Sequence, residues 1–342
     1  MKVKPFARAL AATALALPLL ALAPSAARAQ APADEVEKVR KQAERIEKAV
    51  AELRGLEFRS PVEKGIKTRE ELRAFYGEEL KKEMPDAELE KLQKAYVKIG
   101  LIPRGYELKT RLLALLGEQI AGFYDPEKKQ LFLIGKADDP QQEIVMAHEL
   151  THALQDQHFD LLTVQKSRMK EDDRMAAAKA MIEGEATLAM LGYTLRERFG
   201  GGMDLEQLPD LGPFLKLQER LGSLLGGAEE LASAPAFIRE NLTFSYLDGA
   251  AFVQKGLKRG GWKGLDRMWG DLPESTEQIL HPEKYDAGEH PVAVTLPADV
   301  AAQMGAGWSV PLEDTFGELE LEIWLREAGV DEIGRASCRE RV

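Results

Sequence analysis

The spacing of apolar residues predicts a chain that is mainly helical. Residues 34–54 carry apolar side chains at alternating intervals of three and four positions, which is typical of one face of an amphipathic helix. Gly55 is placed to end this helix. This seam consists of Val36, Val39, Ala43, Ile46, Val50 and Leu53. Because it is shorter than three or four heptads, we expect it to pack onto the body of the protein; binding of a partner helix is the alternative.

Three further helices are expected before residue 121. Thr68 and Glu71 have the spacing of a capping box, and Asp86 is placed to cap a second helix that ends near Gly100. Residues 111–120 belong to the third helix.

The pattern then changes to that of a β-hairpin. Residues 122–134 read GFYDPEKKQLFLI, two short strand-like runs joined by a turn at Pro126. The edge strand of such a hairpin can pair with an extended peptide. The alternative is that the hairpin only covers the next helix.

That next helix begins with clear signals and is expected to be buried. Asp139 is a natural N-cap, Pro140 suits the first helical position, and Gln142 completes a capping box. Apolar residues then occupy most of the helix circumference, as far as the sequence HELTHALQDQHFD that closes the segment at Asp160.

Within this helix, His148, Glu149 and His152 form the motif H-E-x-x-H. Residues four apart share a helix face, so both imidazoles can hold one metal ion while Glu149 lies near its open side. Unpaired polar side chains in a core cost several kcal/mol, roughly 2–7 for a neutral group. A metal explains their presence there; a pair of hydrogen-bonded core histidines is the plain alternative.

A hydrolytic zinc site usually has a third protein ligand. The spacing of His158 fits a metzincin pattern, but Gln155 stands where that pattern has the glycine that lets the last histidine turn back. In the second interpretation the ligand comes from a later helix, expected from about Lys170 to Gly200, in which Glu183 and Glu185 lie in an apolar run. Gly184 inside this helix indicates close packing against another element.

The segment Glu183-Gly-Glu-Ala186 resembles the E-G-x-A segment that carries the third ligand of gluzincin aminopeptidases. The chain over residues 105–325 is also similar to a family of exported bacterial proteins proposed to be zinc metallopeptidases of gluzincin type. This similarity rests on the hairpin, HELTHALQDQHFD, IEGEAT and residues 275–285, STEQILHPEKY. The resemblance implies Glu183 as the third ligand, with Glu185 as the neighbour that is easily confused with it.

Imidazole and carboxylate ligands without a thiolate suit Zn²⁺, one per chain. Zinc lowers the pKa of its water toward about 7, and we expect Glu149 to act as the general base on that zinc-bound water. His281 and Tyr285 are candidates for a further oxyanion donor. For His281 the alternative is the C-terminal end of a short helix capped by Ser275.

Composition describes a globular, acidic protein. The 342 residues have a formal charge of −11, which argues against a general nucleic-acid binder, and no run is suited to span a membrane. Residues 1–29 have the basic start, apolar centre and A-x-A end of a signal peptide, so we expect export to the periplasm or the medium.

The C-terminal end has an unusual sequence. Residues 333–342, IGRASCRERV, match the translation of a common sequencing adapter, so we interpret residues 332–342 as read-through; a genuine basic C-terminus is the alternative. The native chain would then continue past Asp331. Cys338 is the only cysteine, which excludes an intrachain disulfide.

The sequence thus predicts an α+β fold, mostly α, with a small antiparallel sheet beside the H-E-x-x-H helix and a second helical lobe across a cleft. We expect an N-terminal helical region at 30–104 and a metallopeptidase domain at 105–331, in which 203–240 form either a lid or packing helices. The predicted function is an exported zinc metallopeptidase that acts on peptides or proteins. A catalytically inactive zinc-binding scaffold and a helical partner-binding protein are the alternatives.

Overall fold

The computed structural model describes residues 33–83, 85–119, 122–133, 140–169, 171–200, 204–224, 229–310 and 313–330. The expected signal peptide, the tail at 332–342 with Cys338, and the N-cap Asp139 lie outside these ranges. Within them the protein is mostly helical with one small sheet, so the predicted class is confirmed. None of the helices in these ranges is long and apolar enough to cross a membrane.

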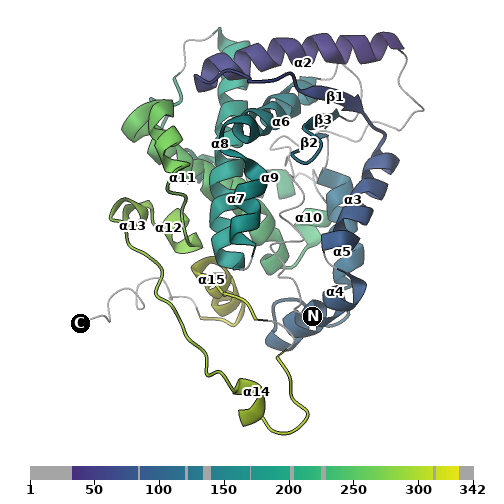
Figure 1. Ribbon diagram of the computed structural model, residues 1–342, viewed down its shortest axis with the longest axis vertical. Coiled ribbons are helices and arrows are strands. Elements are labelled where there is room, and N and C mark those ends of the chain that lie inside the picture. Colours follow the sequence, from purple (N-terminus) through teal and green to yellow (C-terminus); the bar gives the residue numbers. More distant parts are fainter. Residues whose placement is uncertain are drawn as a thin grey trace.

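The helices are α2 (Ala33–Arg54), α3 (Arg69–Glu83), α4 (Asp86–Ile99), α5 (Leu108–Gln119), α6 (Pro140–Phe159), α7 (Leu161–Arg168), α8 (Asp172–Phe199), α9 (Leu211–Leu224), α10 (Glu229–Ser233), α11 (Ala236–Met268), α12 (Thr276–Leu280), α13 (Pro282–Asp286), α14 (Val300–Gln303) and α15 (Glu318–Glu327). The strands are β1 (Glu63–Ile66), β2 (Gly122–Asp125) and β3 (Gln130–Leu133). Figure 1 shows α8 running through the middle of the molecule, with α2 across one end above α6 and the sheet.

The sheet has the order β1-β3-β2 and is mixed. β2 and β3 form the predicted antiparallel hairpin, whereas β1 pairs with β3 in parallel, so the expectation of a purely antiparallel sheet is wrong. The sequence does not predict strand β1, because its residues, EKGI, include only one β-branched side chain. Its partner β3 lies more than 60 residues further along the chain, as the register Glu63 to Gln130 shows.

Helices α8 and α11 cross with their backbones in contact. A Cβ atom at Gly184 would lie 2.3 Å from the carbonyl carbon of Gly249, and one at Gly249 would lie 2.3 Å from the carbonyl oxygen of Ala180. No side chain fits at either position, which explains a glycine in the middle of each helix. The close packing predicted at Gly184 is therefore confirmed.

Helix α6 packs against α2 and the sheet as well as against α8. One face contributes Met146, Leu150 and Leu154 to a cluster with α2 and the sheet, while the histidine face is turned toward α8. The predicted seam of α2 contacts this cluster: Val39, Ala43, Ile46 and Val50 are at most 1% exposed. Packing of α2 onto the body is thus confirmed.

Several predicted helix ends are also observed. Gly55 and Gly100 have φ values of +70° and +85°, and Thr68 and Glu71 form both bonds of the capping box. The prediction for Asp86 is wrong, because Pro85 occupies the N-cap and Asp86 is the first helical residue. Its carboxylate instead lies 2.6 Å from the ammonium group of Lys109.

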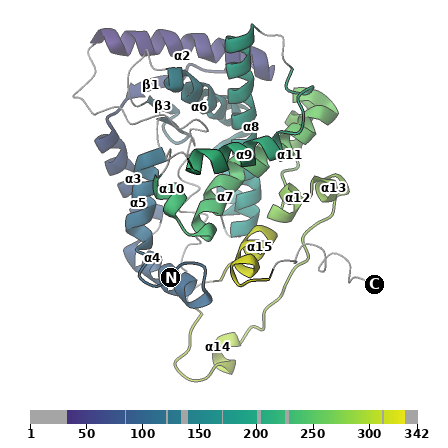
Figure 2. The ribbon, with the colours of Figure 1, turned by 180° about the vertical axis from the view of Figure 1, so that it is seen from behind.

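The region at 203–240 contains helical pieces, as expected. On the side turned to the viewer in Figure 2, α9 lies against α11, with α10 beside it. Leu211 and Leu215 of α9 are buried in the larger core, which favours the packing alternative for these residues.

The segment after α13 has a strand-like sequence but forms no strand. Residues 291–296, which look like a strand in sequence, form no ladder, and Val292, Val294 and Leu296 are all more than 60% exposed. Figure 1 shows this segment leaving the body and returning through α14. Without a neighbouring strand, the alternating pattern has no sheet to join.

Candidate metal centre

Helices α6 and α8 bring three ligand atoms together. The Nε2 atoms of His148 and His152 are 3.1 Å apart, and each lies 3.2 Å from Oε2 of Glu183. These three residues are only 1–2% exposed. One helical turn separates the two histidines on α6, and the contact between α6 and α8 supplies the carboxylate.

The triangle fits a tetrahedral metal ion. For ligand bonds of about 2.0–2.1 Å, the edge of a tetrahedron is about 3.3 Å, close to the three observed distances. Two imidazoles and a carboxylate suit zinc, and three protein ligands leave the fourth position open. In the part of the chain that the structure describes, these residues are the one group of three or more that could hold a metal ion.

The charges of the group are strongly coupled. Burial opposes charging of His152, but the Glu183 carboxylate outweighs this effect and raises the pKa of His152 to about 9. Burial lowers the pKa of His148. Burial also acts to raise the pKa of Glu183, yet the two histidines hold that pKa well below its usual range. The carboxylate is therefore ionised and available to a cation.

Gln155 fixes the orientation of His152. Its side-chain nitrogen donates to the carbonyl oxygen of Ile182 at 3.0 Å, so its oxygen faces Nδ1 of His152 at 2.9 Å. This pattern assigns the proton of His152 to Nδ1 and leaves Nε2 as the electron-pair donor. Sequence reasoning treated Gln155 only as a mismatch to the metzincin glycine; its position three residues after His152 was the signal that could have shown this role.

Glu149 is held beside the triad by the hairpin. Its Oε2 accepts the backbone N–H of Tyr124 at 2.7 Å, while Oε1 is buried with no hydrogen-bond partner among the described residues. Burial raises the pKa of the Glu149 carboxyl to about 8, although His152 and the Tyr124 N–H act in the opposite direction. A bound dication would lower this pKa and favour the carboxylate.

The hairpin also contacts α6 at a second residue, Asp156. The hydroxyl of Tyr124 donates to Oδ2 of Asp156 at 2.7 Å, and the ammonium group of Lys129 lies at the same distance from that oxygen. Because the N–H of Tyr124 on the outer edge of β2 is already used by Glu149, the contacts favour the covering role of the hairpin over strand pairing at this residue.

Tyr246 of α11 is a further residue at the site that sequence reasoning missed. Its ring lies 6.0 Å from the ring of His148, with an angle of 28° between the planes, and the residue is 2% exposed. Tyr246 lies in the long helix α11 without a motif, so only the crossing of α8 and α11 places it here.

The two alternative ligands are not brought to the triad. The oxygens of Glu185 accept hydrogen bonds from Arg54 at 2.5 Å and from Trp269 at 2.7 Å, on another face of α8. Nε2 of His158 lies 2.8 Å from the carbonyl oxygen of Glu57, so the metzincin arrangement is not formed. Residues two apart on a helix point in different directions, which separates Glu185 from Glu183.

His281 and Tyr285 have other contacts. His281 follows α12 as its C-cap, with Ser275 as the N-cap, and its Nε2 lies 2.9 Å from Oε1 of Glu318. The hydroxyl of Tyr285 donates to the carbonyl oxygen of Asp271 at 2.7 Å. The predicted cap is confirmed; a catalytic role for either residue stays a prediction.

Comparison of the sequence with models of known protein families, with curated proteins and with solved structures finds no match.

Proposed function

We propose that this protein is an exported zinc metallopeptidase that hydrolyses peptide bonds. The observation that supports this function best is the buried triangle of His148, His152 and Glu183 with the Glu149 carboxyl beside it. Three ligands and an open fourth position suit hydrolysis better than a purely structural role, because structural zinc sites are usually closed by four protein ligands.

The residues have separate tasks in this mechanism. His148, His152 and Glu183 would hold the ion, and bound zinc would supply Lewis acidity and lower the pKa of a water molecule to about 7. Glu149 takes a proton from the attacking water and delivers it to the leaving amine. The Tyr124 N–H fixes one oxygen of Glu149, so the other is directed to the reacting atoms.

Zinc content and peptide cleavage test this function together. We expect the purified protein to bind about one zinc and to cleave members of a broad peptide library. Glu149→Gln should keep the zinc and reduce kcat by about 10²–10⁴-fold, the usual contribution of a general base. Glu127→Gln, at an exposed position of the hairpin turn, is the matched control and should keep full activity.

The result separates the proposal from its alternatives. Zinc binding without cleavage of any library member would identify an inactive zinc scaffold. Absence of bound zinc under all conditions would exclude the metal-dependent mechanism altogether.

A further inference from the structure

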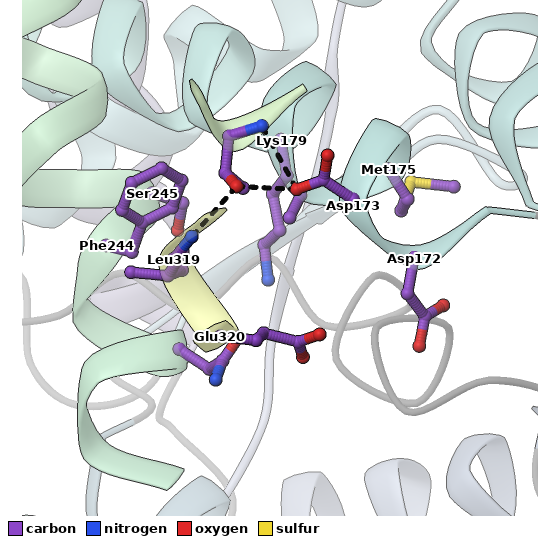
Figure 3. Close-up of a pocket in the computed structure, with 11 residues that line it drawn as sticks. Asp172, Asp173, Met175, Lys179, Phe244, Ser245, Leu319 and Glu320 are labelled. Carbon is purple, nitrogen blue, oxygen red and sulfur yellow. Dashed lines mark hydrogen bonds between the residues drawn. The ribbon is translucent and has the colours of Figure 1, made fainter. Parts of the chain in front are cut away.

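A small cavity lies between α8, α11, α12 and α15, at the N-terminal end of α8. Figure 3 shows Asp172, Asp173 and Lys179 of α8, Ser245 of α11 and Glu320 of α15 among its lining residues. Its volume of about 30 Å³ has room for two or three water-sized groups.

The walls of the cavity hold more acidic than basic residues. Three of the lining residues are acids, and Lys179 is the one base among them. Asp172 and Asp173 are only 5% and 9% exposed. Burial, together with Asp314 and Asp173, raises the pKa of the Glu320 carboxyl to about 8. A cation that enters the cavity would favour the ionised form of Glu320.

A second, independent feature points to a hydrogen-bonding ligand. Ser245 lines the cavity, is 3% exposed, and its buried Oγ has no hydrogen-bond partner among the described residues. A buried hydroxyl without a partner costs about 1–3 kcal/mol. A ligand that donates a hydrogen bond would remove this cost.

The cavity lies along the same pair of helices as the metal centre. Lys179 precedes Glu183 by one turn of α8, and Asp172 precedes it by eleven residues, about 16 Å at 1.5 Å per residue. On α11, Ser245 directly precedes Tyr246, whose ring contacts His148. An extended peptide covers about 3.3 Å per residue, so a long side chain a few residues from the scissile bond spans this separation.

We propose that the cavity binds the primary ammonium group of a peptide substrate, with a lysine side chain as the source. This inference rests on the proposed peptidase function. An ammonium group is compact and has three N–H donors, and Ser245 of α11 and Glu320 of α15 are acceptors in the cavity wall. A bare metal ion fits less well, because these carboxylates form no ligand group of the kind found at the metal centre.

Binding of matched peptides to the zinc-loaded protein tests the proposal. Labelled peptides with acetylated N-termini carry lysine or norleucine at each position in turn, and fluorescence anisotropy gives both affinities. We expect lysine at one position to bind at least tenfold tighter than norleucine. A peptide with a free N-terminus and no lysine shows whether an α-amine, and not a lysine side chain, is the source of the bound ammonium group.

Two variants and a control connect the preference to the cavity. Glu320→Gln should reduce the lysine-to-norleucine ratio to about twofold or less, because it removes the negative charge of the carboxylate. Ser245→Ala should reduce the ratio about threefold, because it removes one acceptor. Glu322→Gln, on the exposed side of the same helix, should leave the ratio unchanged. Zinc content and circular dichroism confirm that each variant is folded.

Each outcome decides between the two proposals. A lysine preference that Glu320→Gln abolishes, without cleavage of any peptide, keeps this inference and defeats the peptidase function. Cleavage with no lysine preference, or with a preference unaffected by Glu320→Gln, defeats this inference alone. If the wild type shows no preference but Lys179→Met gains one, the cavity holds the ammonium group of Lys179 itself, and the inference is wrong.

Discussion

Arg54 at the end of α2 and Glu185 of α8 form a buried ion pair across 131 residues of sequence, with Nε and Oε1 2.5 Å apart. Both side chains are at most 1% exposed. Arg54 also contacts Asp266 of α11 at 2.6 Å, and Trp269 donates to the second oxygen of Glu185. The N-terminal helix is thus bonded to the residue that lies two positions after the ligand Glu183.

This pair predicts a large loss of stability in Arg54→Met. The change leaves the Glu185 carboxylate buried without its cation, which typically costs about 3–5 kcal/mol. Urea unfolding gives the free energy of unfolding. Arg40→Met is the control: Arg40 is half exposed, and solvent screens its ion pairs on α2, so the free energy of unfolding should change little. Equal losses in the two variants would show that the buried pair has no special role.

The contact of α8 and α11 predicts opposite effects of two glycine-to-alanine changes. Gly184→Ala places a methyl group 2.3 Å from the backbone of Gly249, and separating the helices should cost about 1–3 kcal/mol or more. Gly77 lies inside α3 with nothing within 4 Å of an added Cβ, so Gly77→Ala should stabilise by up to about 1 kcal/mol. Thermal unfolding of both variants shows whether each change lowers or raises the stability. Stabilisation by Gly184→Ala would contradict the backbone contact between α8 and α11.

Local signals explain the part of the fold that the sequence predicts. The seam of α2, the capping box at Thr68 and the hairpin depend on neighbours a few residues apart, and each is found in the structure. His148 and His152 are also close in sequence, and their spacing on one helix brings the two imidazoles together.

Long-range contacts account for what was missed. β1 becomes a strand only because β3 lies beside it, and Tyr246 reaches His148 only because α8 and α11 cross at two glycines. Glu183 and Glu185 look equivalent in sequence. The position of Arg54, far away in the chain, distinguishes them.

The two glutamates should therefore respond differently to the same change. Glu183→Gln removes the negative charge of a ligand and should abolish stoichiometric zinc binding, because the atoms that bind the ion directly set its affinity. Glu185→Gln should keep about one zinc per chain while lowering the unfolding midpoint, since Arg54 loses its buried partner. Metal analysis after dialysis, beside thermal unfolding, measures both. Loss of zinc in Glu185→Gln alone would reverse the assignment.

The hydrogen bond from His152 to Gln155 predicts a weaker, positional effect on the metal. Gln155→Ala frees the imidazole to rotate, and loss of such a partner typically costs 10–100-fold in metal affinity, about 1.4–2.8 kcal/mol. Gln155→Glu keeps an acceptor for Nδ1 and should restore most of the affinity. His158→Ala should leave zinc affinity unchanged because His158 bonds to Glu57. Competition with a chromophoric chelator measures all three; a loss in His158→Ala would favour the metzincin arrangement.

The partly exposed Glu320 carboxyl predicts a pH dependence of stability. Its pKa is raised from 4.5 to about 8 in the folded protein, first by burial and then by Asp314 and Asp173. Between these two values the folded state holds a proton that the unfolded state has lost, so this group makes stability fall as pH rises from about 4.5 to about 8.

Glu320→Gln cannot ionise and should lose this decline. The variant should thus be the more stable protein at pH 8 by on the order of 1 kcal/mol, after allowance for solvent screening, and should match the wild type at pH 4.5. Urea unfolding across this range measures the difference, with Glu322→Gln as the control on the same helix. A difference that does not grow with pH would show that Glu320 is ionised in the folded protein over the whole range.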